Sequence, residues 1–407
     1  MLKWILFDLN SFFASCEQQE DPSLRGKPVA VIPTMADSTS VIAASYEAKR
    51  LGIKTGTKVG DAKKMCPGLI LKTGNHKLYT QYHHKIIKAV EEVLPIKKVL
   101  SIDEMACELI GREREFEAAK KIAQQMKDHV RAVVGSEIKS SVGVGPNVLI
   151  AKIASDMMKP DGLVLIEPDQ ILQKIGHLPI EDISGVGRQM KIKLNAHGYL
   201  KIADLIKASE QELKKHWGSI WGLRIAKELR GEDMAWRTQA PQKSISHQHV
   251  LPPQLRNMEK CLQVLLKLTA KAAARLRVEK MKATSLSIYV KCIDGTRFEN
   301  SISFQDSDDT VFLLQQVQNL YRAFGNRQRP IKVAVVFGGL ADGPTQISFF
   351  DNPKNHQINQ ALDHINSRFG ANTLYMASTQ SVLSSAKTRI AFNHIPQLSD
   401  EFDEDDL

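Results

Sequence analysis

Three acidic residues beside short apolar runs could together hold metal ions. Trp4-Ile5-Leu6-Phe7 is typical of a buried strand, and Asp8 follows it directly. Val99-Leu100-Ser101-Ile102 is a second β-favouring run, and it ends in Asp103 and Glu104. An ionised carboxylate next to an apolar run is costly unless it is paired, solvated or bound to a metal. Carboxylate oxygens suit hard cations such as Mg²⁺, and two such ions can clamp the attacking and leaving oxygens of a phosphoryl transfer.

Three separately solvated or salt-bridged acids are the alternative to a metal site. Side chains of neighbouring residues on a flat strand also point to opposite faces. Asp103 and Glu104 therefore need a twist or a strand end to bring their carboxylates together.

The elements expected around these acids alternate between strands and helices. Strands are predicted at 27–32 and 140–144, and a short helical pattern at 46–51. An amphipathic helix is predicted at 115–134, and Asn147 is expected to cap a helix that ends near Met157. These elements predict an α+β catalytic domain with a mixed sheet.

The composition is that of a globular protein with a hidden basic character. The chain has 407 residues, 43% hydrophobic and 25% charged, which predicts roughly two to four domains. Its net charge is +10, but the last eight residues carry six acids, so the rest of the chain stands at +16. Such a body favours a polyanionic partner, with nucleic acid first and an anionic membrane surface second.

Several classes of protein are disfavoured by the same sequence. We expect no transmembrane helix, because no run of 18 apolar residues occurs, and no signal peptide at the N-terminus. The five cysteines are scattered, odd in number and without CxxC spacing. They are therefore expected to be reduced thiols of a cytoplasmic protein and not a zinc site or a disulfide framework.

Short helices joined by glycine turns are predicted from 168 to 231. Within them Gly185-Val186-Gly187 precedes a basic helix that carries Arg188 and Lys191, a pattern that resembles a helix-hairpin-helix. Free backbone amides beside positive charge can bind a phosphate, whereas a plain turn is the alternative.

A second α+β unit is expected at about 244–340, after a polar tether at 232–243. It contains a strongly basic helix at 258–280 and strands at 285–291 and 331–337. The basic helix face could simply be solvated, but because the whole body is basic we expect it to follow a nucleic-acid backbone. A further amphipathic helix is predicted at 357–369, and the closing acidic run is expected to be disordered.

Five stretches, in order, resemble motifs of the Y-family translesion DNA polymerases. They are Phe7 to Glu17, Arg25 to Val31, Ala44 to Gly52, Ser101 to Glu104, and Ser141 to Gly162. The resemblance covers about residues 1–340 and is closest to the UmuC branch of the bacterial UmuC/DinB group, because Asn10 and Ser15-Cys16-Glu17 are UmuC-like. Asn10 stands where the DinB branch has an aspartate.

The resemblance implies a right-hand polymerase fold. The mixed-sheet palm and small fingers would span 1–167, with the fingers at about 20–76, and the helix-hairpin-helix thumb would span 168–231. A linker at 232–243 and a little-finger domain at 244–342 would precede the C-terminal region, 343–407.

It also implies a template-directed, low-fidelity DNA-directed DNA polymerase that acts in DNA damage tolerance and the SOS response. Asp8, Asp103 and Glu104 would be catalytic and would hold two Mg²⁺ ions, with the Leu9 carbonyl as a further ligand. The residues implied to bind the incoming nucleotide are Phe12, Phe13, Ser40, Tyr46, Lys49 and Lys159. Phe13 stands at the steric-gate position, where a ring under the sugar excludes a 2′-hydroxyl.

The expected partners are primer–template DNA, deoxynucleoside triphosphates and the sliding clamp, the β subunit of bacterial replication. Gln346-Ile347-Ser348-Phe349-Phe350 resembles the pentapeptide that enters the clamp pocket, in which Gln346, Ile347, Phe349 and Phe350 would make the contacts. UmuC-like members require a UmuD′-like accessory dimer and a recombinase filament, whereas DinB-like members act alone, and the residues leave both modes open. A catalytically silent scaffold that binds DNA and the clamp is the alternative to an enzyme.

Overall fold

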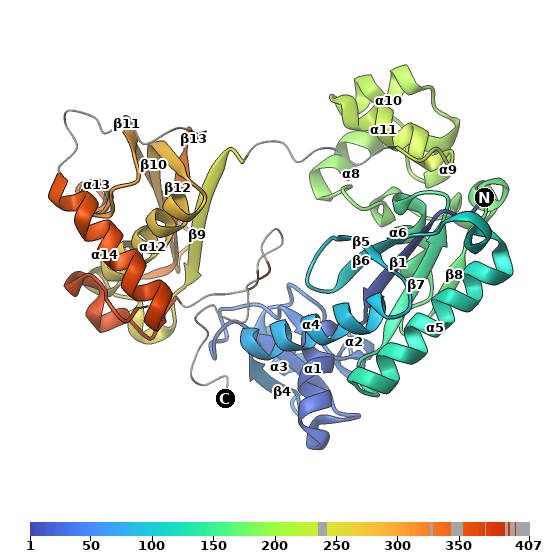
Figure 1. Ribbon diagram of the computed structural model, residues 1–407, viewed down its shortest axis with the longest axis horizontal. Helices are drawn as coiled ribbons and strands as arrows, with labels where there is room; N and C mark the ends of the chain where they lie inside the picture. The colour runs from blue at the N-terminus through green and yellow to red at the C-terminus, as the bar shows by residue number, and fades with distance from the viewer. Residues whose placement is uncertain are drawn as a thin grey trace.

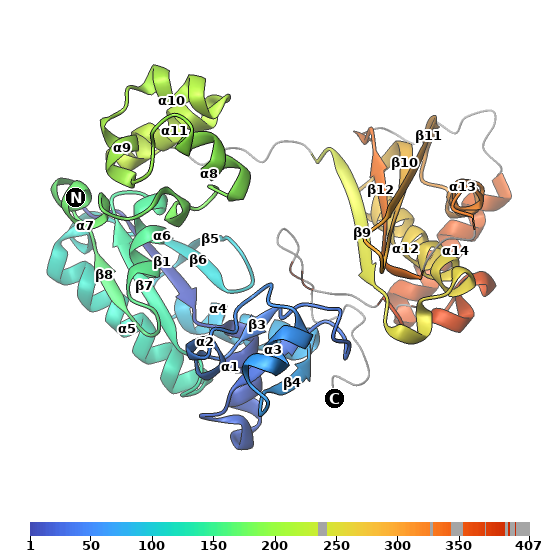
Figure 2. The same ribbon diagram turned by 180° about the vertical axis from the view of Figure 1, so that it is seen from behind.

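The computed structural model describes residues 1–234, 242–325, 329–342, 353–370, 372–386, 390 and 395. The expected clamp peptide at 346–350, the acidic run at 400–407 and most of the expected tether lie outside these residues. Two sheets and a set of short helices make up the N-terminal half, and a third sheet with its helices lies to one side of them (Figures 1 and 2).

The N-terminal sheet has the strand order β5-β6-β1-β7-β8. Its strands are β1 (Trp4–Leu9), β5 (Ile96–Val99), β6 (Glu104–Glu108), β7 (Ser140–Gly145) and β8 (Leu163–Leu165). Its neighbours pair antiparallel except β7 and β8, which are parallel, so the predicted mixed sheet is confirmed.

Each face of this sheet carries different helices because the side chains of β1 alternate. Ile5 and Phe7 pack with residues of α4 (His76–Glu91) and α5 (Phe116–Val134). Trp4 and Leu6 point to the other face and pack with Ala151 of α6 (Val148–Met157). Asp8 has the same parity as Trp4 and Leu6, so it faces α6.

Helix α6 lies very close to the sheet, which fixes the side chains that it presents there. A Cβ atom on Gly143 of β7 would lie 2.0 Å from the Ala151 carbonyl oxygen and 2.4 Å from the Ser155 nitrogen. Only glycine allows this approach. The predicted cap is confirmed, since Asn147 Oδ1 accepts the Ile150 N–H at 2.9 Å.

A small sheet and short helices complete the first part of the chain. Its strands are β2 (Val29–Ile32), β3 (Ala43–Ala44) and β4 (Ile70–Thr73), in the order β3-β2-β4. The helices beside it are α1 (Phe12–Glu20), α2 (Tyr46–Arg50) and α3 (Val59–Met65). The helical pattern predicted at 46–51 therefore forms.

Short helices follow from residue 171 to 229, as predicted. They are α7 (Ile171–Ile175), α8 (Arg188–Asn195), α9 (Ile202–Lys207), α10 (Glu210–Trp217) and α11 (Ile220–Leu229). Asn147 attaches this helical unit to the start of α6, because its Nδ2 donates to the carbonyl oxygens of Glu228 at 2.7 Å and Glu232 at 2.9 Å.

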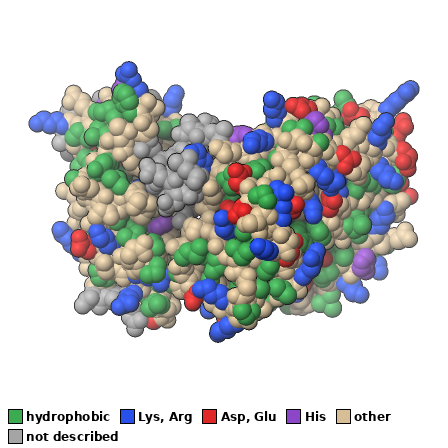
Figure 3. All heavy atoms as spheres, turned by 90° about the horizontal axis from the view of Figure 1, so that it is seen from below, with side chains coloured by type: hydrophobic (Ala, Val, Ile, Leu, Met, Phe, Trp, Pro, Cys, Tyr) green, Lys and Arg blue, Asp and Glu red, His purple; other side chains and the backbone are tan. Residues whose placement is uncertain are grey.

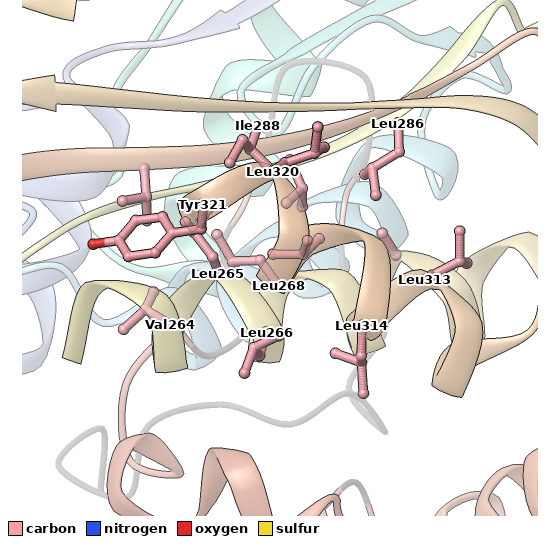
Figure 4. Packing of buried hydrophobic residues seen from close by; sticks show 14 of the residues in the cluster. Val264, Leu265, Leu266, Leu268, Leu286, Ile288, Leu313, Leu314, Leu320 and Tyr321 are labelled. Carbon is pink, nitrogen blue, oxygen red and sulfur yellow. The ribbon is translucent and has the colours of Figure 1, made fainter. Parts of the chain in front are cut away.

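The C-terminal sheet is antiparallel, in the order β11-β10-β12-β9. Its strands are β9 (Ser244–Val250), β10 (Met281–Cys292), β11 (Arg297–Ser307) and β12 (Pro330–Gly338), with the short β13 (Ala341–Asp342) beside β10. Helices α12 (Met258–Val278) and α13 (Thr310–Arg322) cover one face, where their leucines meet Leu286 and Ile288 (Figure 4). Elements α12, β10 and β12 were predicted from the sequence, whereas β9, β11 and α13 were not.

Three of the five basic side chains of α12 bond to the C-terminal segment, so over this part of the helix the prediction of a surface that follows a nucleic-acid backbone is wrong. Lys267 donates to the carbonyl oxygens of Leu383 and, at 2.7 Å, Ser385, and Lys271 donates to that of Ala386 at 3.0 Å. Arg277 makes a two-pronged ion pair with Asp363 of α14 (Pro353–Phe369), with distances of 2.6 and 2.8 Å. Helix α14 begins four residues earlier than the helix predicted at 357–369.

All five cysteines are buried and free, as predicted. Among the described residues no helix is both long and apolar enough to cross a membrane.

Candidate active site

Asp8 and Glu104 face each other across two antiparallel strands. They are register partners on β1 and β6, and neighbours in this position lie side by side. The strand predicted at 99–102 is wrong: β5 ends at Val99, the chain bends at 101–103, and Glu104 begins β6. Asp103 lies in this bend, so it escapes the alternation of a regular strand, and its carbonyl accepts the Leu9 N–H at 2.9 Å.

The three carboxylates share one electrostatic environment. Burial raises the pKa of Asp103, and the neighbouring charge of Asp8 raises it further. Burial likewise raises the pKa of Glu104, with additional contributions from Asp8 and Asp103 and an opposing one from Lys152. Ser101 Oγ donates to Asp103 Oδ1 at 2.5 Å and holds that carboxylate in place.

Lys152 of α6 lies between these acids, and the sequence analysis did not single it out. Its Nζ is 2.5 Å from Asp8 Oδ2, 2.9 Å from Glu104 Oε1 and 3.3 Å from Asp156 Oδ2. Burial by itself lowers the pKa of Lys152, but the three carboxylates raise it above its usual range. The i,i+4 spacing of Lys152 and Asp156, one turn after the Asn147 cap, is the sequence signal that could have found it.

The donor set of this site suits a divalent cation. Asp8, Asp103 and Glu104 bring three carboxyl groups together, and carboxylate oxygens are the ligands that Mg²⁺ prefers. Over the described ranges, no three His, Cys, Asp or Glu side chains are arranged to hold a metal ion as they stand. A cation held by Asp8 and Glu104 would therefore have to displace Lys152 Nζ from both carboxylates.

The basic residues expected at the triphosphate do come together beside Asp8. Lys159 Nζ is 2.7 Å from Asp8 Oδ1 and 2.8 Å from Asp156 Oδ1. Lys49 Nζ lies 4.6 Å from the centre of the Tyr46 ring. Burial, followed by the charge of Lys159, lowers the pKa of Lys49, and burial raises that of Tyr46. The charge of Lys159 acts on both Lys49 and Tyr46, so these three half-buried side chains lie near one another.

Phe13 is held by an aromatic stack that the sequence analysis missed. Its ring lies 4.2 Å from that of Tyr79, at 11° to it, and Tyr79 OH donates to Glu17 Oε1 at 2.6 Å. Phe13 is only partly buried, so part of this ring remains exposed. Phe12 is 3% exposed and its side chain belongs to the core, and its expected place in the nucleotide site stays a prediction.

Two further residues stay predictions. Ser40 lies in the small-sheet part, where it pairs with Lys58, and the Leu9 carbonyl remains an expected metal ligand.

The glycine turn of the helical unit faces α6 across a cleft of about 730 Å³. Its lining includes Lys152 and Asp156 on one side and Ser184 to Gly187 on the other. Gly185 needs its flexibility here, since its φ is +98°. The expectation that all three amides of this turn are free is wrong for Val186, because its N–H donates to the Ile183 carbonyl at 2.9 Å and its side chain is buried. Lys191 pairs with Glu181 at 2.5 Å, and Arg188 begins α8.

His83 of α4 supports the carboxylate bend from behind. Its Nδ1 lies 2.7 Å from the Ile102 carbonyl oxygen, next to Asp103. Burial lowers the pKa of His83 to about 4, so at neutral pH the ring is uncharged and Nδ1 carries the proton that it donates.

Folding stability should therefore depend on the protonation of His83. Its pKa is depressed in the folded state, so the stabilisation is complete above the unfolded pKa near 6.5 and is lost as the pH falls towards about 4. The expected loss is about 3 kcal/mol. Urea unfolding across this range should show a smaller pH dependence for His83→Asn, whose amide can still donate; parallel curves for the two proteins would contradict the assignment.

Comparisons with known proteins cover most of the chain. Residues 7–156 match the impB/mucB/samB family, and residues 242–349 match the C-terminal domain of the same family. DNA polymerase IV of Moorella thermoacetica is 30% identical over 382 residues, 92% of this chain and 95% of that protein. DNA polymerase IV 1 of Bacillus subtilis is 28% identical over 403 residues, 95% of each chain.

Solved structures share the fold. A Y-family DNA polymerase chimera superposes with a TM-score of 0.70 at 24% identity, over 84% of this chain and 100% of that one. DinB from Sulfolobus solfataricus gives a TM-score of 0.52 at 24% identity, over 83% of this chain and 98% of that one. The mixed α/β architecture expected from the sequence is thereby confirmed.

Proposed function

Because this chain belongs to the impB/mucB/samB family of Y-family DNA polymerases, we propose that its carboxylate cluster is the active site of a translesion DNA polymerase. The observation that carries this assignment is the meeting of Asp8, Glu104 and Asp103 with the Lys159 ammonium group in one half-buried place. A catalytically silent scaffold would not need these three carboxylates and the Lys159 ammonium group together. The relatives named above are polymerases.

Asp8, Asp103 and Glu104 are proposed to hold two Mg²⁺ ions. Held there, such ions would supply acidity to the primer 3′-hydroxyl and positive charge to the leaving pyrophosphate. Lys159, Tyr46 and Lys49 are proposed to bind the triphosphate, with the ammonium groups facing the charge that grows on its oxygens. Phe13, fixed on Tyr79, is proposed to lie under the sugar and to exclude a 2′-hydroxyl.

The domain roles follow from this placement. The N-terminal sheet with α4 to α6 would be the palm, the small-sheet part the fingers and the helical unit the thumb. The Gly185 and Gly187 amides and Arg188, across the cleft from α6, are proposed to hold a DNA phosphate. The C-terminal sheet with α12 and α13 would be the little finger.

We propose that the little finger contacts DNA through the open face of its sheet. Lys332 of β12, Lys291 of β10 and Arg297 of β11 are register partners, so three cations form one row across the strands. Tyr289 and its register partner Glu299 lie next to this row, and the small hydroxyl side chains of Ser287 and Ser285 follow further along the same face. On the face of the molecule that Figure 3 shows, lysine and arginine side chains lie scattered among acidic ones.

Replacing Lys291 and Lys332 together by Met should weaken DNA binding for every sequence. The slope of log binding constant against log salt concentration should fall by about one for each phosphate that the protein no longer neutralises. Lys271→Met on α12 is the matched control, because the C-terminal segment covers that face. An equal decrease of the slope for Lys271→Met would instead place the DNA on α12.

Placement in the UmuC branch is proposed on Asn10 and Ser15-Cys16-Glu17, whereas the named relatives are DNA polymerase IV. The proposal adds the sliding clamp as partner of 346–350 and leaves open the accessory dimer and the recombinase filament. Primer extension by the purified protein, with Mg²⁺ and deoxynucleotides on undamaged and abasic templates, tests the function. Extension would establish a self-sufficient polymerase, and silence that clamp and accessory proteins do not relieve would contradict the proposal.

A further inference from the structure

Lys159 is carried by a turn that other parts of the chain hold from two sides. The turn spans 158–162, between α6 and β8, and it presents the Lys159 ammonium group to Asp8 and Asp156. Lysine is a flexible point charge, so the place of its ammonium group depends on where its backbone is held. A turn has no ladder of backbone hydrogen bonds of its own, so few groups within it could hold the Lys159 backbone in place.

Asn10 holds the turn from the strand side. Its side chain is 1% exposed, and Oδ1 accepts the Asp161 N–H at 2.7 Å. Its Nδ2 donates to Ser141 Oγ at 3.0 Å, and Ser141 Oγ also accepts the Gly162 N–H at 3.3 Å. Both polar atoms of the Asn10 amide therefore have a partner, and the amide joins the turn to the end of the strand that carries Asp8.

Two cations of α5 hold the other side of the turn. Lys127, buried at 5% exposure, donates to the carbonyl oxygens of Asp161 and, at 3.0 Å, Gly162. Arg131 Nη2 donates to both carboxylate oxygens of Asp161, at 2.9 and 2.7 Å. It is unusual for a buried ammonium group to donate to two backbone carbonyls and not only to an acid. Here these two bonds fix the turn.

The turn has a backbone conformation that needs such support. Asp161 has a φ of +61°, in the left-handed region that residues with a side chain seldom adopt. Strained residues of this kind persist where neighbouring groups determine them, and they gather at functional sites. The groups that determine Asp161 are Asn10, Lys127 and Arg131.

We propose that Asn10, Lys127 and Arg131 are positioning residues that fix the Lys159 turn. They thereby determine the affinity of the site for the incoming triphosphate. The inference rests on the proposed function. It also assigns Asn10 a role: the residue that differs from the DinB branch is a neutral amide that clamps this turn and is not a metal ligand. The network couples α5, on the far face of the sheet, to the nucleotide site.

A double-mutant cycle tests the inference. Asn10→Leu, Lys159→Ala and the double variant are compared by their affinity for the correct deoxynucleotide, in a complex whose primer ends in a dideoxynucleotide. Asn10→Leu should weaken this affinity about tenfold, but by less than about twofold when Lys159 is already Ala. Primer–template affinity should stay unchanged. On an extendable primer, KM for the nucleotide should rise more than kcat falls.

Matched variants separate positioning from folding. Asn10→Asp can still accept the Asp161 N–H and should recover most of the affinity. Arg131→Met replaces a partly exposed helix residue, so it offers a second test if Asn10→Leu folds poorly. It should lower the nucleotide affinity when Lys159 is present and change it little when Lys159 is Ala. Lys121→Met, exposed on the same helix, should leave nucleotide affinity unchanged.

Two results would overturn the inference in different ways. If Asn10→Leu and Arg131→Met cost the same with and without Lys159, the network would be merely structural and the inference alone would fail. If Lys159→Ala left the nucleotide affinity unchanged, the inference would fail together with the proposed role of Lys159.

Discussion

Replacing Asp103 by Asn should lower the rate of nucleotide addition by about 10³-fold or more, while primer–template binding stays intact. The substitution keeps the shape and the bond from Ser101 Oγ, but it removes a charge from the carboxylate cluster. Loss of that charge weakens the hold on a cation that has to neutralise developing negative oxygens. Single-turnover primer extension measures the rate, and fluorescence anisotropy of labelled DNA measures the binding.

Two variants give this experiment its control. Glu104→Gln should behave like Asp103→Asn, because Glu104 is the register partner of Asp8. Glu117→Gln, exposed on α5, removes an equal charge far from the cluster and should change neither quantity. Extension by Asp103→Asn at the unsubstituted rate would overturn the site assignment, and a joint loss of extension and DNA binding would show a folding defect instead.

The second large effect is expected from Phe13→Ala. The partly exposed Phe13 ring is braced by Tyr79, whose hydroxyl is held by Glu17, so the ring cannot rotate away from a sugar placed against it. Removing the ring opens room for a 2′-hydroxyl. The ratio of kcat/KM for a deoxynucleotide to that for the matching ribonucleotide should fall about 100-fold.

The brace itself offers the comparison. Tyr79→Phe keeps the stacked ring but loses the bond to Glu17, and it should relax the discrimination less than Phe13→Ala does. Phe12→Leu, in the core, should affect stability and leave the ratio unchanged. Unaltered exclusion of ribonucleotides by Phe13→Ala would mean that another group faces the sugar.

Local patterns predicted many of the elements that build this site. The apolar run before Asp8, the amphipathic period of α5 and the Asn147 cap all form as expected, because each depends on residues within one or two turns of one another. The same local patterns placed Asp103 and Glu104 at the end of a strand. Asp103 instead lies in a bend and Glu104 begins the next strand, since pairing of β5 with β6 turns the chain back between these strands.

The charged helix α12 shows why a surface cannot be assigned from one segment. Its lysines and arginines are as basic as a DNA-binding face requires, yet residues far later in the chain cover them through Asp363 and the carbonyls of 383–386. The little-finger cations that we propose to contact DNA come from three strands. Only the register of these strands brings Lys332, Lys291 and Arg297 into one row.

The sequence by itself determined the chemistry of this protein: which acids, which cations and which aromatic ring stand in the motifs, and that they belong together. Tertiary structure alone decided how they meet, because Lys152, Tyr79, His83 and the Asn10 clamp bond to partners that lie 19 to 151 residues away in the chain. Side-chain type is a local property, but a hydrogen bond between distant segments exists only after the sheet and its helices have packed.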